Sequence, residues 1–170
     1  MYLKYNLNTK HNLQANFKAF QKALKSSFIN MQVKERTSMY FNSIISSSEL
    51  GKLLENGSTE KILDDHIPIV KLYLPLQRCI FLLTHVDTHQ PSMAFGLFDF
   101  ADGGSPMICN MDINGLEKVK LFKIFRVRKD EKFQGLFPIS VYAKAAYEHK
   151  RIIEDKATLQ LFQTDRNNNL

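Results

Sequence analysis

Apolar side chains recur at helical spacing in the first third of the chain. Five of them follow one another at steps of four, three, four and four residues: Leu13, Phe17, Phe20, Leu24 and Phe28. Such steps place side chains on one face of a helix, so residues 12–28 are predicted to be helical. The same reasoning predicts a second helix around 32–45. A third is predicted at 47–56, between capping serines and a stop at Gly57.

Beyond Gly57 the pattern changes from that of a helix to that of a strand. Runs rich in apolar and β-branched residues occupy 67–74, 79–86 and 93–100, and turn-forming residues separate them. Three adjacent strands joined by short loops predict an antiparallel meander. Residues 107–111 are predicted to add another short strand.

The remaining residues mix helix and strand signals. Asp112 is predicted to cap a short helix over 113–119, and residues 121–127 read as a strand. A final helix is predicted to begin near Pro138, with Ser140 as its capping residue, and to continue through residues 152–153.

Together these elements predict a single α+β domain over residues 1–170. N-terminal helices come first, and a small antiparallel sheet of three to five strands, flanked by helices, follows them. Within that domain we expect a helical extension at 1–52, a core at 53–152 and a C-terminal tail at 153–170.

Charge is segregated along the chain, whose formal net charge is +6. Residues 1–62 carry +5, residues 63–117 carry −5 and residues 118–156 carry +6, while the last fourteen cancel. Segregated charge can steer an anionic partner, and nucleic acid is the commonest one. The alternative is a lysine-rich solvated surface that serves solubility alone.

Two groups of cations are the candidates for contacts with phosphate. One group lies close to the predicted strand at 121–127 and consists of Arg126, Arg128, Lys129 and Lys132. The other falls at helical steps of four and three and consists of Lys18, Lys22 and Lys25. Arginine and lysine side chains supply the sequence-independent part of nucleic-acid affinity, so a basic surface formed by either group would bind nucleic acid.

Signals for catalysis or metal binding are weaker. His85, Asp87 and His89 alternate along a predicted strand end, a spacing that could hold a metal ion between two imidazoles and a carboxylate. Turn chemistry after Asp87 argues against that alignment. Cys79 and Cys109 lack a metal-ligand spacing and are expected to be buried free thiols. We therefore nominate no catalytic residue and expect no cofactor.

The chain contains no apolar run of the roughly 18 to 20 residues that a membrane span needs, and no leader of the signal-peptide type. We therefore expect a soluble, cytoplasmic protein without a membrane partner.

Three blocks of sequence carry a family resemblance. They are, in chain order, Pro68-Ile69-Val70-Lys71-Leu72-Tyr73, Leu82-Leu83-Thr84-His85-Val86-Asp87 and Ala94-Phe95-Gly96-Leu97-Phe98-Asp99. With weaker blocks that follow them, the region 53–152 resembles the domain of unknown function 2958 family of bacterial plasmids and integrative elements. The resemblance implies a small α+β domain, a setting near conjugation, antirestriction and replication genes, and no established biochemical activity.

These observations lead to one preferred hypothesis and two alternatives. The preferred hypothesis is a non-catalytic accessory protein of a mobile genetic element that binds nucleic acid through a basic surface. The first alternative is a protein that binds and modulates a host or element-encoded factor, as an antirestriction or anti-CRISPR protein or a secreted effector does. The second is a metal-dependent hydrolase that uses His85 and Asp87. The oligomeric state stays open at this point.

Overall fold

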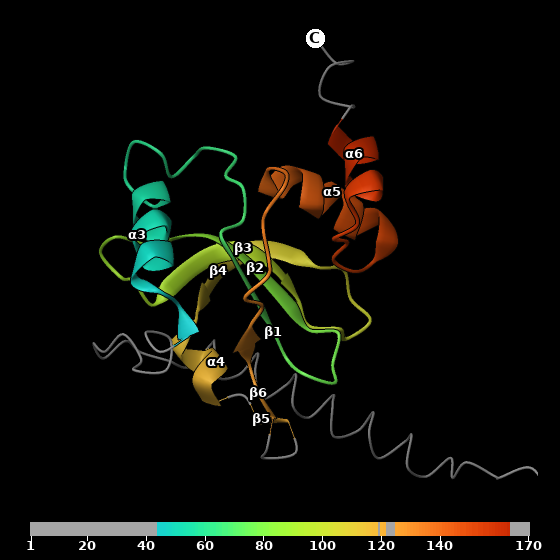
Figure 1. Cartoon of the computed structure of the whole chain (residues 1–170), viewed down its shortest axis with the longest axis horizontal. Coiled ribbons are helices and arrows are strands. Elements are labelled where there is room, and N and C mark those ends of the chain that lie inside the picture. The colour runs from blue at the N-terminus through green and yellow to red at the C-terminus, as the bar shows by residue number, and fades with distance from the viewer. Residues whose placement is uncertain (1–43, 119, 122–124, 164–170) are drawn as a thin grey trace, which may run out of the picture.

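A five-stranded antiparallel sheet forms the centre of the protein (Figure 1). The computed structural model describes residues 44–118, 120–121 and 125–163. The strands of the sheet lie in the order β4-β3-β2-β1-β7, and β5 and β6 form a separate pair. The strand bounds are β1 Val70–Tyr73, β2 Ile80–Val86, β3 Met93–Asp99, β4 Met107–Asp112, β5 Lys120–Leu121, β6 Phe125–Arg126 and β7 Arg128–Lys129. The helix bounds are α3 Ser47–Asn56, α4 Asn114–Lys118, α5 Ile139–His149 and α6 Lys156–Gln163.

Strands β1 to β4 form the meander that the sequence predicts, including the extra strand β4. Each strand pairs antiparallel with the next: Leu72 lies opposite Phe81, and Leu82 lies opposite Leu97. The register between β2 and β3 shifts between Leu83 and His85. Antiparallel strands joined by short loops need no crossover, which explains why local pattern was sufficient to predict this part of the fold.

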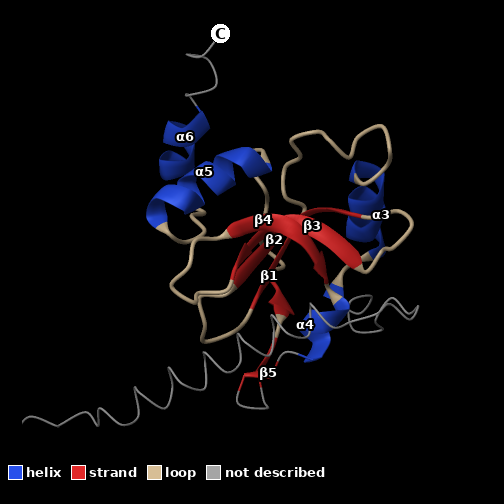
Figure 2. Ribbon diagram, turned by 180° about the vertical axis from the view of Figure 1, so that it is seen from behind, coloured by secondary structure: helices blue, strands red, loops and turns tan. Residues whose placement is uncertain are grey.

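The central strands β2 and β3 are buried on both faces, and the alternation along the strands assigns residues to two separate cores. Phe81 packs in a cluster with Leu53 of α3, whereas its neighbour Leu82 packs in a cluster with Tyr142 of α5 and Leu159 of α6. Successive side chains of a strand point to opposite faces, so α3 covers one face and the α5–α6 pair covers the other. Figure 2 shows these helices over different parts of the sheet.

The helix signals were partly right. Ser46 and Glu49 form a capping box at the start of α3, as the serines before this helix suggested. The predicted cap of α5 is wrong, because Pro138 holds the N-cap position and Ser140 lies inside the helix. Ser140 donates instead from its backbone N (3.0 Å) and its Oγ (2.6 Å) to the carboxylate of Asp65. Helix α5 also ends before residues 152–153, because Lys150 adopts a left-handed backbone with φ of 55°.

Two further predictions differ from the structure. In place of the single strand expected at 121–127, β5 and β6 pair with each other antiparallel, and β7 follows at Arg128–Lys129. The expected tail at 153–170 contains α6, and Leu159 of this helix is fully buried. The Asp155 carboxylate caps the first turn of α6, because it accepts from the Thr158 backbone N at 2.8 Å. The predicted helix at 12–28, all of the predicted helix at 32–45 except residues 44–45, and most of the expected extension at 1–52 lie outside the described residues.

Among the described residues, no helix has both the length and the apolar character that crossing a membrane requires.

Candidate nucleic-acid interface

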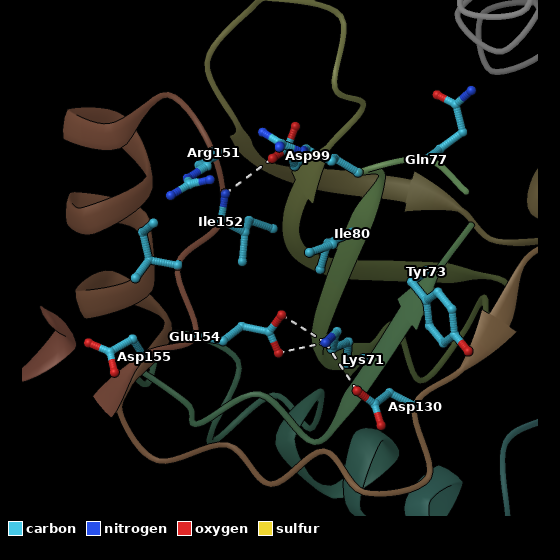
Figure 3. Close-up of a pocket in the computed structure, with 12 residues that line it drawn as sticks. Lys71, Tyr73, Gln77, Ile80, Asp99, Asp130, Arg151, Ile152, Glu154 and Asp155 are labelled. Atoms are coloured by element: carbon cyan, nitrogen blue, oxygen red, sulfur yellow. Dashed lines mark hydrogen bonds and ion pairs between the residues drawn. The ribbon is translucent and has the colours of Figure 1, made fainter. Parts of the chain in front are cut away.

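A pocket of about 530 Å³ lies where the sheet meets the linker between α5 and α6 (Figure 3). Three elements line it: strands β1 to β3 with the hairpin loop between β1 and β2, the segment after β7, and the linker. The lining residues are Lys71, Tyr73, Gln77, Arg78, Ile80, Asp99, Asp130, Arg151, Ile152, Ile153, Glu154 and Asp155. The pocket therefore lies on the face of the sheet that carries α5 and α6.

Lys71 links three segments of the pocket wall. Its Nζ lies 2.6 and 2.7 Å from the two carboxylate oxygens of Glu154 and 3.0 Å from Asp130 Oδ2, and its side chain is only 12% exposed. Burial by itself would lower the pKa of Lys71, but the hydrogen bonds to Glu154 and Asp130 outweigh burial and raise it. The same hydrogen bond lowers the pKa of Asp130. Lys71 therefore stays charged and joins β1 to the α5–α6 linker.

Asp99 binds the α5–α6 linker near its start, at Ile152. This carboxylate is 4% exposed, and its two oxygens accept from the backbone N of Ala101 at 2.8 Å and of Ile152 at 3.1 Å. A buried carboxylate needs such donors to offset the cost of its desolvation. Together, Asp99 and Lys71 hold the linker against the sheet at two points and give the pocket a fixed wall.

Two arginines, Arg78 and Arg151, line the pocket. Arg78 and Arg151 are exposed, and neither guanidinium forms an ion pair with a residue that the structure describes. The lining also contains carboxylates, but those of Asp99 and Glu154 are already engaged by donors of the protein. Of the cations in the lining, the guanidinium groups of these two arginines thus remain available to an anionic ligand.

The structure separates two adjacent candidates that the sequence placed in one group. Arg128 lies opposite Tyr73 in the ladder, and side chains of directly opposed residues share a face, so exposed Arg128 belongs to the pocket face. Lys129 lies opposite Leu72 and points to the face covered by α3.

Lys129 is fully engaged on that face. Its side chain is 9% exposed, and its Nζ lies 2.8 Å from Glu131 and 3.0 Å from Glu49 of α3. Hydrogen bonds to Glu131 and Glu49 raise the pKa of Lys129. Two carboxylates compensate this charge, so Lys129 is a structural residue and a poor contact for phosphate.

The remaining predicted cations lie partly inside and partly outside the described residues. Arg126 and Lys132 are exposed, and the backbone N of Lys132 donates to Asp130 Oδ1 at 3.1 Å, which places Lys132 beside the pocket. The second predicted group, formed by Lys18, Lys22 and Lys25, lies outside the described residues.

The candidate metal ligands do not come together. His85 is buried and its ring stacks on Phe95 at 4.7 Å between centroids, and burial lowers its pKa. Asp87 Oδ1 instead accepts from the backbone N of His89 at 2.7 Å and forms a turn. Within the described part of the chain, no group of three histidine, cysteine, aspartate or glutamate side chains is arranged to hold a metal ion.

Sequence reasoning missed the pocket residues Tyr73, Arg78 and Arg151. One signal for Tyr73 was present, because alternation along the predicted strand at 67–74 puts Lys71 and Tyr73 on one face. The arginines had no such signal, since they lie in a hairpin loop and a helix linker that are 73 positions apart in the chain.

Comparison with known families agrees with this fold outline. The sequence profile of the family described as protein of unknown function (DUF2958) matches residues 44–153, which is well over half of the chain. The chain belongs to this family. The match confirms the resemblance and contains the sheet, α3, α5 and the pocket's linker up to Ile153, while α6 follows it. No curated protein and no solved structure matches the chain.

Proposed function

We propose that this protein binds nucleic acid through the pocket face of its sheet, as a non-catalytic accessory protein of a mobile genetic element. The observation that carries the proposal is the gathering of exposed cations on one face: Arg128 beside Tyr73, Lys132 beside Asp130, and the exposed Arg78 and Arg151 at the pocket. These residues come from three separate segments of the chain: the loop before β2, β7 with the residues that follow it, and the linker between α5 and α6. Their convergence supports a surface for phosphate contacts.

Formal charge in the lining itself does not explain attraction to a polyanion. Three cations and four carboxylates line the pocket, which sums to −1, and adding Arg128 and Lys132 changes the sum to +1. The proposal therefore rests on the availability of the cations and not on their excess. The carboxylates are held by donors of the protein, whereas the exposed guanidiniums can each donate to phosphate oxygens.

A titration at two salt concentrations tests the proposal. Fluorescence anisotropy of labelled single-stranded and double-stranded oligonucleotides would be followed at about 50 mM and about 200 mM salt, because phosphate contacts make affinity salt-dependent. We expect wild-type protein to bind more tightly at the lower salt and the Arg128→Ala, Lys132→Ala variant to lose affinity. A matched control, Lys52→Ala with Lys144→Ala, removes the same charge from exposed positions outside the pocket lining and should bind as wild type does. Absence of binding at the lower salt would refute the proposal.

A protein partner is the second candidate, and one observation favours it. Ile62, Leu63 and Ile67 are exposed in the segment between α3 and β1, with Leu63 96% exposed, and none of them lines the pocket. A contiguous exposed apolar patch is typical of a protein contact, and this candidate requires these three side chains to form one. This candidate predicts that Leu63→Asp prevents retention of a host protein from nuclease-treated lysate and leaves nucleic-acid affinity unchanged.

A further inference from the structure

We infer that the pocket accommodates one unstacked nucleotide of a single strand, with its base against Tyr73 and Ile80 and its phosphates on Arg78 and Arg151. The inference rests on the proposed function and names the form of nucleic acid that it selects. It follows from the size of the pocket, the rigidity of its walls and the order of its lining groups.

The size and rigidity of the pocket suit a small rigid group. Its volume of about 530 Å³ falls within the range of roughly 300–1,000 Å³ that is typical of small-ligand sites. The wall formed by the linker is fixed by the hydrogen bond from the Ile152 backbone N to Asp99 and by the ion pair between Lys71 and Glu154. A preformed pocket avoids the cost of ordering its walls when the ligand enters.

The lining groups are arranged in the order in which a nucleotide presents its parts. Figure 3 shows Tyr73 and Arg151 on different sides of the pocket, with Ile80 and Ile152 between them. An aromatic ring and an apolar floor stack a base whatever its identity, and arginine forks bind phosphate oxygens. A base seated at the Tyr73 end would leave its phosphates toward the arginines.

The turn that directly precedes Arg78 adds a separate observation. The backbone N of Gln77 donates to the Leu74 carbonyl at 3.1 Å, and Leu76 has φ of 65°, as the third residue of a type II turn does. That position favours glycine, yet here it holds a leucine that is 77% exposed. An apolar side chain held out by strained backbone beside two lining residues is suited to contact a ligand at the rim.

A duplex would not present its bases to this pocket. Paired and stacked bases must be turned out of the helix at a cost before they can enter a pocket, whereas the bases of a single strand are already accessible. The arrangement therefore favours single strands over duplexes of the same length.

The test compares a single strand of about ten thymidylates with a duplex of equal length, by fluorescence anisotropy on the full chain. The variants are Tyr73→Leu, which removes the aromatic face, Tyr73→Phe, which keeps it, and Arg78→Ala with Arg151→Ala. The double variant Lys52→Ala, Lys144→Ala is the charge control. Circular dichroism and thermal melting of each variant verify that it is folded.

We expect the single strand to bind wild type about tenfold or more tightly than the duplex. Tyr73→Leu should weaken single-strand binding about tenfold, in line with the usual contribution of one stacked base, while Tyr73→Phe stays within about twofold of wild type. The arginine double variant should lose affinity and the lysine control should not. Equal affinity for the two forms, or no effect of Tyr73→Leu, would overturn the inference and leave the proposed function standing if binding stays salt-dependent. Binding of neither form would refute both.

Discussion

Lys71 provides the most direct test of how the pocket wall is held. Lys71→Met keeps the length of the side chain but removes the cation that Glu154 and Asp130 share at 2.6–3.0 Å. Breaking a fully buried ion pair by removing one partner costs about 3–5 kcal/mol, whereas exposed pairs contribute about 1 kcal/mol or less. Because Lys71 is 12% exposed and its partners 31% and 36%, we expect a loss between these limits, about 1–3 kcal/mol.

Urea denaturation followed by circular dichroism measures this loss at neutral pH. Lys61→Met is the matched control, because it removes the ion pair between Lys61 and Glu55 at the surface and should leave the midpoint unchanged. A Lys71→Met variant as stable as wild type would refute the assignment of Lys71 as a link between β1 and the α5–α6 linker.

The difference between wild type and Lys71→Met should depend on pH in a defined direction. The pKa of Asp130 is lowered from 3.8, so its contribution is complete above that value and is lost as the pH falls through the lower folded pKa. The pKa of Lys71 is raised from 10.5, so its contribution is complete below that value and is lost as the pH rises through the higher folded pKa. The urea midpoints of wild type and Lys71→Met should therefore differ most between about pH 5 and pH 9 and converge at both extremes of pH.

Three further changes probe strain, packing and thiol chemistry. Leu76→Gly relieves positive-φ strain at an exposed turn, so its melting temperature should equal or exceed that of wild type, while oligonucleotide affinity falls if Leu76 touches the ligand. Gly96→Ala places a Cβ 2.0 Å from the Leu82 carbonyl oxygen of the neighbouring strand, so the urea midpoint of this variant should fall. A midpoint unchanged from wild type would contradict the observed register. Burial raises the pKa of Cys79 to about 12, so a maleimide should leave Cys79 unmodified at pH 8 until denaturant is added, as mass spectrometry of the labelled chain would show.

The meander was predictable because its information is local. Each strand from β1 to β4 alternates or runs apolar within a few residues, and short loops leave antiparallel pairing as the simple arrangement. The last third was harder, because its elements are set by distant contacts. The Lys129 side chain bonds Glu49 across 80 positions, and Asp99 holds Ile152 across 53.

The candidate site shows the same limit. A run of cations in the sequence cannot reveal which face each side chain takes when the strand is only two residues long, as β7 is. Pairing with β1 decides the matter: Arg128 joins the pocket face with Tyr73, whereas Lys129 turns toward α3. The two arginines of the pocket lining are brought to one site by the packing of the α5–α6 linker on the sheet.

The salt dependence of oligonucleotide affinity for Arg128→Ala and Lys129→Ala tests the central claim most directly, because these neighbours differ in face and not in charge. We predict that Arg128→Ala binds a single strand more weakly and that its plot of log affinity against log salt is shallower by about 0.7, the value of one lost phosphate contact. Lys129→Ala should keep both the affinity and the slope of wild type while its unfolding midpoint falls. Equal losses of affinity in the two variants, or a loss confined to Lys129→Ala, would contradict the assignment of nucleic-acid binding to the pocket face.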